Sequence, residues 1–121
     1  MKIQNTFFTL VFMLAATTLA HAHAFLDHSD PKVGSTEAGS PTQVKIWFTE
    51  ELEGAFSKIQ VFDASGKEID KKDSKVDASD KALMAVSVPT LAPGTYKVRW
   101  IAVAVDTHHT SGSFEFTVKG A

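Results

Sequence analysis

Apolar and polar residues alternate along much of the chain after residue 42. Alternation of this kind places every second side chain on one face of an extended segment, as in a β-strand with one buried side. The inward positions of five such segments are Val44, Ile46 and Phe48; Ile59 and Val61; Met84, Val86 and Val88; Tyr96, Val98 and Trp100; and Phe114, Phe116 and Val118. Residues 101–105 are apolar on both faces, as in a central strand. No convincing amphipathic helix appears in the sequence.

Turn-forming residues separate these segments. Asp63–Gly66 fits a type I turn, and Pro93-Gly94 marks another turn before the next strand. Short strands divided by turns are typical of an antiparallel sandwich or a small barrel. The pattern therefore predicts an all-β protein, an Ig-like β-sandwich, in which the charged residues 67–81 form a solvated loop and edge strand. The large strand aromatics are expected in the core: Trp47, Trp100 and Phe116.

Residues 1–22 have the composition of a secretory signal. Lys2 supplies a positive start, residues 7–20 form an uncharged apolar run, and Ala20–Ala22 fits the small-x-small pattern of a signal-peptidase site. The run is shorter than the roughly 20 apolar residues that a membrane-spanning helix needs. An uncleaved N-terminal anchor is the alternative. We expect cleavage after Ala22, which leaves residues 23–121 as a single exported domain.

Composition excludes several classes of function. The sequence has no cysteine, so disulfides, thiolate metal sites and lipid attachment at a new N-terminal cysteine are all excluded. It contains 12 Lys and Arg and 14 Asp and Glu residues. Removal of Lys2 with the signal leaves 11 basic and 14 acidic side chains, a formal charge of −3. Without a basic surface, nucleic acid is not an expected partner.

A candidate metal site combines the new N-terminus with the end of an apolar segment. Cleavage gives His23 a free α-amine beside its imidazole, and the two can chelate one metal ion in a six-membered ring. Asp106 and His108 follow the apolar residues 101–105, and positions i and i+2 of an extended chain face the same side. Three nitrogens and one carboxylate oxygen form a tetragonal set that suits Cu(II), although Zn²⁺ accepts the same atoms.

Three further residues lie near these positions in the sequence. His28 and His109 have no clear geometric argument in their favour, and we expect surface residues that at most assist the site. Glu50 ends the strand segment that begins at Val44. It can orient a ligand imidazole through a hydrogen bond, or it can simply face water.

The motifs together resemble the CopC family of periplasmic copper-binding proteins, including its YobA-like members. They are "HAFLDHSDPKVGS", "FTE", "LAPGTYKVRW" and "VDTHHTSGSFEFTV", and the resemblance spans the whole mature chain. It implies a Greek-key β-sandwich that binds Cu(II) at one end through His23, Asp106 and His108, with Glu50 near the site. Many members have Gly before the ligand His and Pro after it, where this chain has Thr107 and His109.

The resemblance also implies a function. Some members carry a methionine-rich Cu(I) site, but the mature chain has one methionine, Met84, at an inward strand position, so no Cu(I) site is expected. We expect a periplasmic Cu(II) carrier for copper resistance or homeostasis, which sequesters copper or passes it to a CopD-like inner-membrane transporter.

Two other classes of function remain as alternatives. Copper monooxygenases also use a first-residue histidine on an Ig-like sandwich, but they need an open equatorial position, which Asp106 is expected to fill. A protein whose ligands fill the metal's equatorial plane is not expected to be an enzyme. A secreted, metal-free interaction domain is the second alternative, because sandwiches serve many functions.

Overall fold

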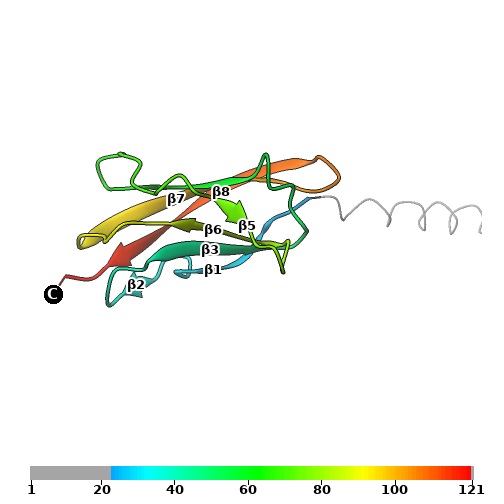
Figure 1. The fold of residues 1–121 in the computed structure, drawn as a ribbon. Coiled ribbons are helices and arrows are strands. Elements are labelled where there is room, and N and C mark those ends of the chain that lie inside the picture. Colours follow the sequence, from blue (N-terminus) through cyan, green and yellow to red (C-terminus); the bar gives the residue numbers. More distant parts are fainter. Residues whose placement is uncertain (1–22, 121) are drawn as a thin grey trace, which may run out of the picture.

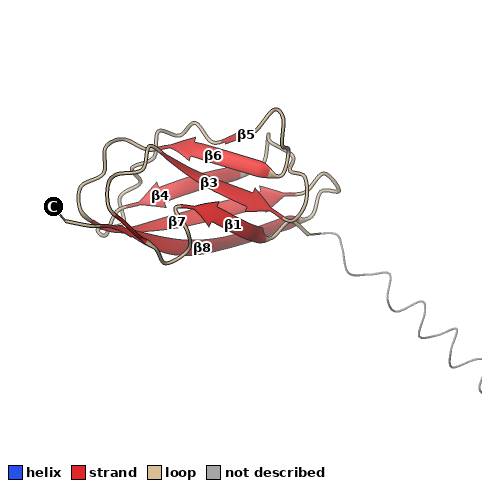
Figure 2. Cartoon of the chain, turned by 90° about the horizontal axis from the view of Figure 1, so that it is seen from below, coloured by secondary structure: helices blue, strands red, loops and turns tan. Residues whose placement is uncertain are grey.

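The computed structural model describes residues 23–120, which form two four-stranded sheets packed face to face (Figures 1 and 2). The predicted signal, residues 1–22, and its cleavage point lie outside the described residues. The strands are β1 Leu26–Asp30, β2 Thr36–Glu37, β3 Gln43–Phe48, β4 Lys58–Phe62, β5 Lys75–Val76, β6 Leu83–Ser87, β7 Gly94–Val103 and β8 His109–Val118. Residues 23–120 contain no helix with the length and apolar character needed to cross a membrane.

One sheet has the strand order β1-β3-β6-β5 and the other has the order β2-β8-β7-β4. All pairs are antiparallel except β2 with β8, which run parallel. β7 and β8 are the longest strands and pair along their full length, from Gly94 opposite Val118 to Val103 opposite His109. The expected all-β sandwich is therefore confirmed.

The core consists of the inward residues that the alternation identified. Ile46 from β3, Met84 from β6 and Phe116 from β8 are at most 1% exposed and meet between the sheets. Burial of each such side chain stabilises the fold by about 1.5–3 kcal/mol relative to exposure. The stretch 67–81 is largely an exposed loop that includes the short edge strand β5, as expected, but Asp70 within it is buried and accepts a hydrogen bond of 2.8 Å from Val61 N.

The prediction that Trp47 belongs to the core is wrong. Ile46 points inward, so the pleat of β3 turns Trp47 to the outer face, where it is only partly buried. The ring of His28, its cross-strand neighbour on β1, stacks on the indole with centroids 4.4 Å apart and planes 8° apart. Trp100 and Phe116, in contrast, are buried as expected.

Trp100 lies against Gly112, its cross-strand partner on β8. A Cβ atom at residue 112 would be 2.6 Å from Cζ2 and 2.8 Å from Cε2 of the indole. The same ring packs edge-on against Phe48 of the other sheet, at a centroid distance of 5.2 Å. The indole thus fills the space that a side chain at residue 112 would need.

Gly112→Ala should destabilise the protein by about 1–3 kcal/mol, because the methyl group overpacks a buried ring that has little room to shift. Gly39→Ala is the matched control, since a Cβ atom there meets no atom within 4 Å. Thermal and denaturant unfolding of both variants measure the difference. Equal stability of the two variants would show that Trp100 moves aside freely.

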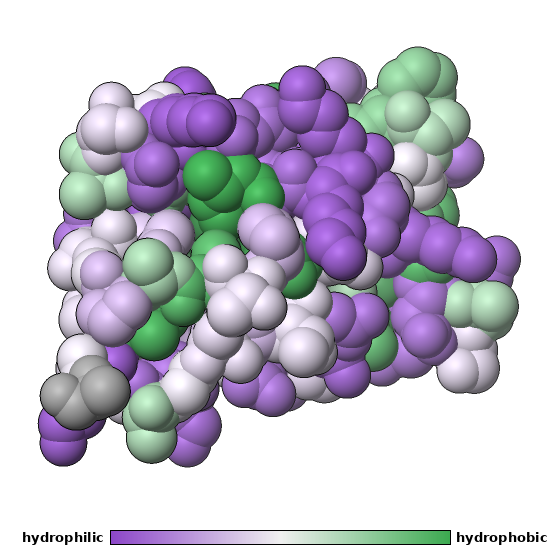
Figure 3. Space-filling view, turned by 60° about the vertical axis from the view of Figure 1, so that its left-hand side comes forward, coloured by the Kyte–Doolittle hydropathy of each residue, from purple (hydrophilic) through white to green (hydrophobic). Residues whose placement is uncertain are grey.

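The two ends of the sandwich differ. The described chain starts at one end, close to the turn between β7 and β8, and the C-terminus lies at the opposite end (Figure 1). That opposite end is turned toward the viewer in Figure 3, where hydrophilic side chains cover much of the surface. The predicted site residues belong to the end where the described chain begins.

Candidate metal centre

The backbone of residues 23–25 is fixed at the edge of the sandwich. Ala24 is fully buried, and Thr49 N, just after β3, donates a hydrogen bond of 2.8 Å to Phe25 O. His23 itself is exposed. The first described residues are therefore held by the folded domain, with the His23 side chain outside the core.

Asp106 lies in a tight turn and not on an extended strand, which corrects the geometry expected from the sequence. Thr107 N donates to Ala104 O at 2.8 Å, and Ala104 N donates to His108 O at 3.0 Å. Thr107 has a φ of 76°, in the left-handed region that glycine adopts most easily. Many members of the family that the sequence resembles are expected to have glycine here, whereas Thr107 adopts this conformation at a steric cost.

The turn nevertheless brings Asp106 and His108 into contact. Asp106 Oδ2 is 3.2 Å from His108 Nδ1, and His108 N donates to Asp106 Oδ1 at 3.3 Å. Because Nδ1 faces the carboxylate, Nε2 of His108 is available to another partner. Their side chains are 54% (His108) and 44% (Asp106) exposed, so the pair is open to ions from solvent.

The pKa of Asp106 is lowered from its ordinary value. Partial desolvation acts to raise it, but hydrogen bonds from the amide and imidazole of His108, and the attraction of that ring, outweigh this effect. The carboxylate is therefore ionised at neutral pH. It presents a negative charge beside an imidazole at this end of the molecule.

His23 lies beside the same histidine. The ring centroids of His23 and His108 are 4.8 Å apart, with planes at 50°. Metal–nitrogen bonds of about 2.0–2.1 Å place two nitrogens on one ion at most about 4 Å apart. The two imidazoles are thus neighbours, with centroids separated by little more than this distance.

Glu50 lies between two contacts that join its segment to this end. Thr49, the preceding residue, is hydrogen-bonded to Phe25. The following residue, Glu51, accepts a hydrogen bond of 3.2 Å at its carbonyl oxygen from Val105 N. Glu50 is partly buried. Its segment is therefore hydrogen-bonded both to residues 23–25 and to the β7–β8 turn, which is consistent with a place near the site.

The other two histidines lie apart from this arrangement. His28 stacks on Trp47, and its Nδ1 is 2.7 Å from Asp27 Oδ2. His109 opens β8 opposite Val103 and is exposed. Within residues 23–120, the recorded ring and ion-pair contacts connect His23 and Asp106 to His108 and not to His109.

The described residues do not form a ready-made metal cluster. No three His, Cys, Asp or Glu side chains among residues 23–120 are arranged to hold an ion together. Instead, His108 contacts both His23 and Asp106. The predicted amine donor exists only after cleavage, because in the full chain that nitrogen belongs to a planar peptide bond.

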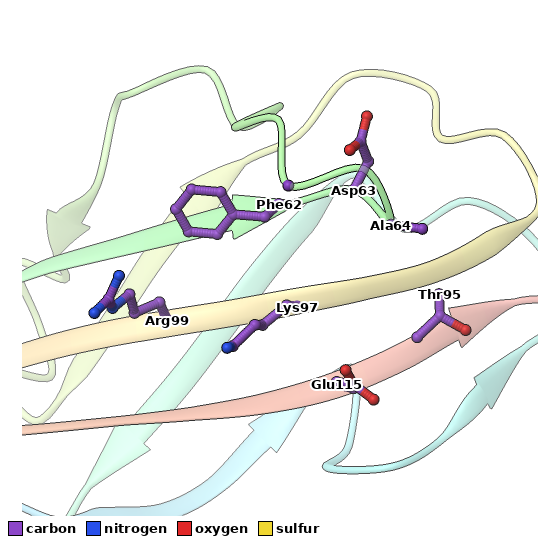
Figure 4. A pocket seen from close by; sticks show the side chains of 8 residues that line it. Phe62, Asp63, Ala64, Thr95, Lys97, Arg99 and Glu115 are labelled. Atoms are coloured by element: carbon purple, nitrogen blue, oxygen red, sulfur yellow. The ribbon is translucent and has the colours of Figure 1, made fainter.

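A surface pocket of about 450 Å³ lies elsewhere, on the outer face of the second sheet (Figure 4). Its lining residues are Phe62, Asp63, Ala64, Gly66, Thr95, Lys97, Arg99 and Glu115. They include two cations and two carboxylates but no imidazole or thioether. Imidazole suits Cu(II) and thioether selects Cu(I), so this lining does not suit a copper site.

Comparison with known proteins decides the family. The CopC domain family matches residues 26–119. The chain belongs to the CopC family. The family resemblance expected from the sequence motifs is therefore confirmed, over nearly all of the described residues.

Several CopC relatives cover most of this chain. Copper resistance protein C of Pseudomonas syringae pv. tomato is 34% identical, over 98% of this chain and 100% of that protein. Protein YobA of Escherichia coli K12 is 33% identical, over 81% of this chain and 80% of that protein. Copper transport protein CutJ of Bacillus subtilis is 29% identical over 90% of this chain, but this chain spans only 20% of CutJ.

Solved CopC structures have the same fold. CopC from Methylosinus trichosporium OB3b superposes with a TM-score of 0.76 at 33% identity, over 80% of this chain and 94% of that one. The methionine-rich copper resistance protein PcoC from Escherichia coli gives a TM-score of 0.70 at 31% identity, over 81% and 100%. Both similarities support the sandwich architecture described above.

Sequence reasoning missed two residues at this end, Thr49 and Thr110. Both lie within motifs that the sequence analysis quoted, "FTE" and "VDTHHTSGSFEFTV". Their hydroxyl groups contact the backbone of residues 23–25. Threonine is common in and beside strands, so no sequence signal distinguished these two from the others.

Proposed function

We propose that the processed protein binds one Cu(II) ion and serves copper resistance or homeostasis as a carrier. The observation that carries the proposal is the juxtaposition of His23, His108 and Asp106 at one end of a CopC-family sandwich. The names of the relatives, copper resistance protein C among them, support copper as the cargo.

The donor set favours Cu(II) over other ions. The His23 amine and imidazole, the His108 imidazole and the Asp106 carboxylate supply three nitrogens and one oxygen, a combination suited to a tetragonal Cu(II) centre. The Asp106 carboxylate, whose pKa is lowered from its ordinary value, is charged at neutral pH as aspartates usually are. We assign Glu50 to the surroundings of the site, where it orients a ligand rather than binding the ion.

No Cu(I) site is included in the proposal. Met84, the only methionine among residues 23–120, is completely buried between the sheets. Its thioether belongs to the core and has no route to an exposed ion. Binding of Cu(I) at a methionine cluster is therefore not part of the expected behaviour.

Export and cleavage are part of the same proposal. The segment 1–22 has the charge and apolar pattern of a secretory signal, and cleavage after Ala22 creates the His23 amine. We assign the mature protein to the periplasm. There it holds copper or delivers it to a CopD-like transporter in the inner membrane.

Two exposed apolar residues beside the site support delivery to another protein. Phe25 is 53% exposed and packs edge-on against His23, and Val105 is 59% exposed and directly precedes Asp106. Exposed apolar side chains around a polar centre are common at protein contact sites. We assign no catalytic step, because four protein donors complete the equatorial plane of the ion.

Mass spectrometry of the exported protein, followed by Cu(II) titration of the same material, tests the proposal. We expect a first residue of His23 and binding of one Cu(II) per chain, with an EPR spectrum of a tetragonal centre that couples to nitrogen. A correctly processed protein without a Cu(II) d–d band or EPR signal would favour a metal-free interaction domain instead.

A further inference from the structure

Two threonine hydroxyls, one from each sheet, hold the backbone beside His23. Thr49 follows β3 of the first sheet, and Thr110 is the second residue of β8 in the other sheet. Phe25 N donates to Thr49 Oγ1 at 2.9 Å, and Thr49 Oγ1 donates to His23 O at 3.3 Å. Thr110 Oγ1 donates to Ala24 O. The carbonyls of two successive residues are thus bound by hydroxyls from opposite sheets.

Residues 23–25 are consequently fixed on both sides. The side chain of Ala24 is fully buried between the sheets. Its carbonyl, the carbonyl of His23 and the amide of Phe25 all have partners at Thr49 or Thr110. The His23 imidazole, in contrast, is exposed and lies beside the His108 ring.

We propose that Thr49 and Thr110 are positioning residues that hold the chain end so that His23 stays beside His108. This inference rests on the proposed function for its consequence in copper binding. Neither hydroxyl supplies a donor to the ion. Both act through the main chain, by ordering residues 23–25 before the metal arrives, which removes part of the entropy cost of binding.

Thr49 has a second effect through the carbonyl that it engages. A free N-terminal residue can chelate a metal through its amine and its own carbonyl oxygen, in a five-membered ring. The hydrogen bond from Thr49 Oγ1 uses one of the two lone pairs of the His23 carbonyl oxygen and so competes with metal binding there. The amine is thereby directed toward the ring that it forms with the His23 imidazole.

Valine substitutions test the inference, because valine matches the shape of threonine but lacks the hydroxyl. In the processed protein, Thr49→Val and Thr110→Val should each weaken Cu(II) binding roughly tenfold, the lower end of the effect of losing a group that orients a ligand. Thr49→Val should also change the EPR parameters of the bound ion. Thr49→Ser and Thr110→Ser keep the hydroxyl and should restore binding.

Thr117→Val is the matched control. Thr117 lies on β8 like Thr110, but at the other end of the strand, where its hydroxyl is 3.3 Å from that of Thr95. The change removes a hydroxyl contact of the same strand without touching residues 23–25. It should leave the copper affinity and the EPR spectrum unchanged, whereas a general loss of stability would affect all three valine variants.

NMR of the metal-free protein separates this inference from the proposed function. Thr49→Val should expose the Phe25 amide to rapid hydrogen exchange, and both variants should reduce the contacts between the His23 and His108 rings. If these signals and the copper affinity match the wild type, the positioning role is wrong. If wild-type protein fails to bind Cu(II), the proposed function fails, and the NMR measurements still decide whether the two threonines position His23.

Discussion

One extra residue before His23 should weaken Cu(II) binding by more than roughly 100-fold. Loss of a group that only orients a ligand costs at most about that factor, and the extra residue removes a ligand itself. The α-amine would become an amide, whose nitrogen lone pair is delocalised into the carbonyl and is not a good donor near neutral pH. The six-membered chelate would then be lost, and His23 would bind the ion through its imidazole alone.

A Gly-extended protein and the processed protein, compared by competitive Cu(II) titration, measure this effect. Proteolytic removal of the extra glycine should restore the affinity, which shows that the fold is unaffected. His23→Ala with its natural start at residue 23 separates the two donors, because it retains the amine and loses only the imidazole. Equal affinity of the extended and processed forms would rule out the amine as a ligand.

The architecture could be predicted because the inward and outward positions follow a strict period of two. Val44, Ile46, Val61 and Val98 are all fully buried, as the alternation requires. The strand β1 was not predicted, since "LDHSD" has little alternation and only its Ser29 is buried. Its extended form depends on pairing with β3, a contact between distant parts of the chain.

The site could be predicted only in part. Asp106 and His108 were expected on one face of a strand, but a turn with a left-handed Thr107 brings them together. The contact between His23 and His108 joins distant parts of the chain, and so do the hydrogen bonds from Thr49 and Thr110 to the backbone beside it, which local sequence does not encode. The motif resemblance nevertheless allowed the three residues to be grouped, because residues that meet only in the folded protein can still recur together in a family's sequence pattern.

His108→Ala should also weaken Cu(II) binding by more than roughly 100-fold, because it removes a proposed ligand and not merely a group that orients one. It should remove one nitrogen from the coupling pattern in the EPR spectrum. His109→Ala, one residue along the chain, should leave both the affinity and the coupling unchanged. His109 pairs with Val103 at the start of β8 and has no recorded ring contact with His23.

The adjacent pair makes the test sensitive to geometry. Both histidines are exposed, so neither substitution removes a core side chain, and the two variants should have similar unfolding temperatures. A difference in copper binding between them therefore reports the direction of each side chain at the β7–β8 turn. If His109→Ala lost the nitrogen coupling and His108→Ala retained it, the bound form would have a turn displaced by one residue, and the contact of His108 with Asp106 and His23 would not be the metal site.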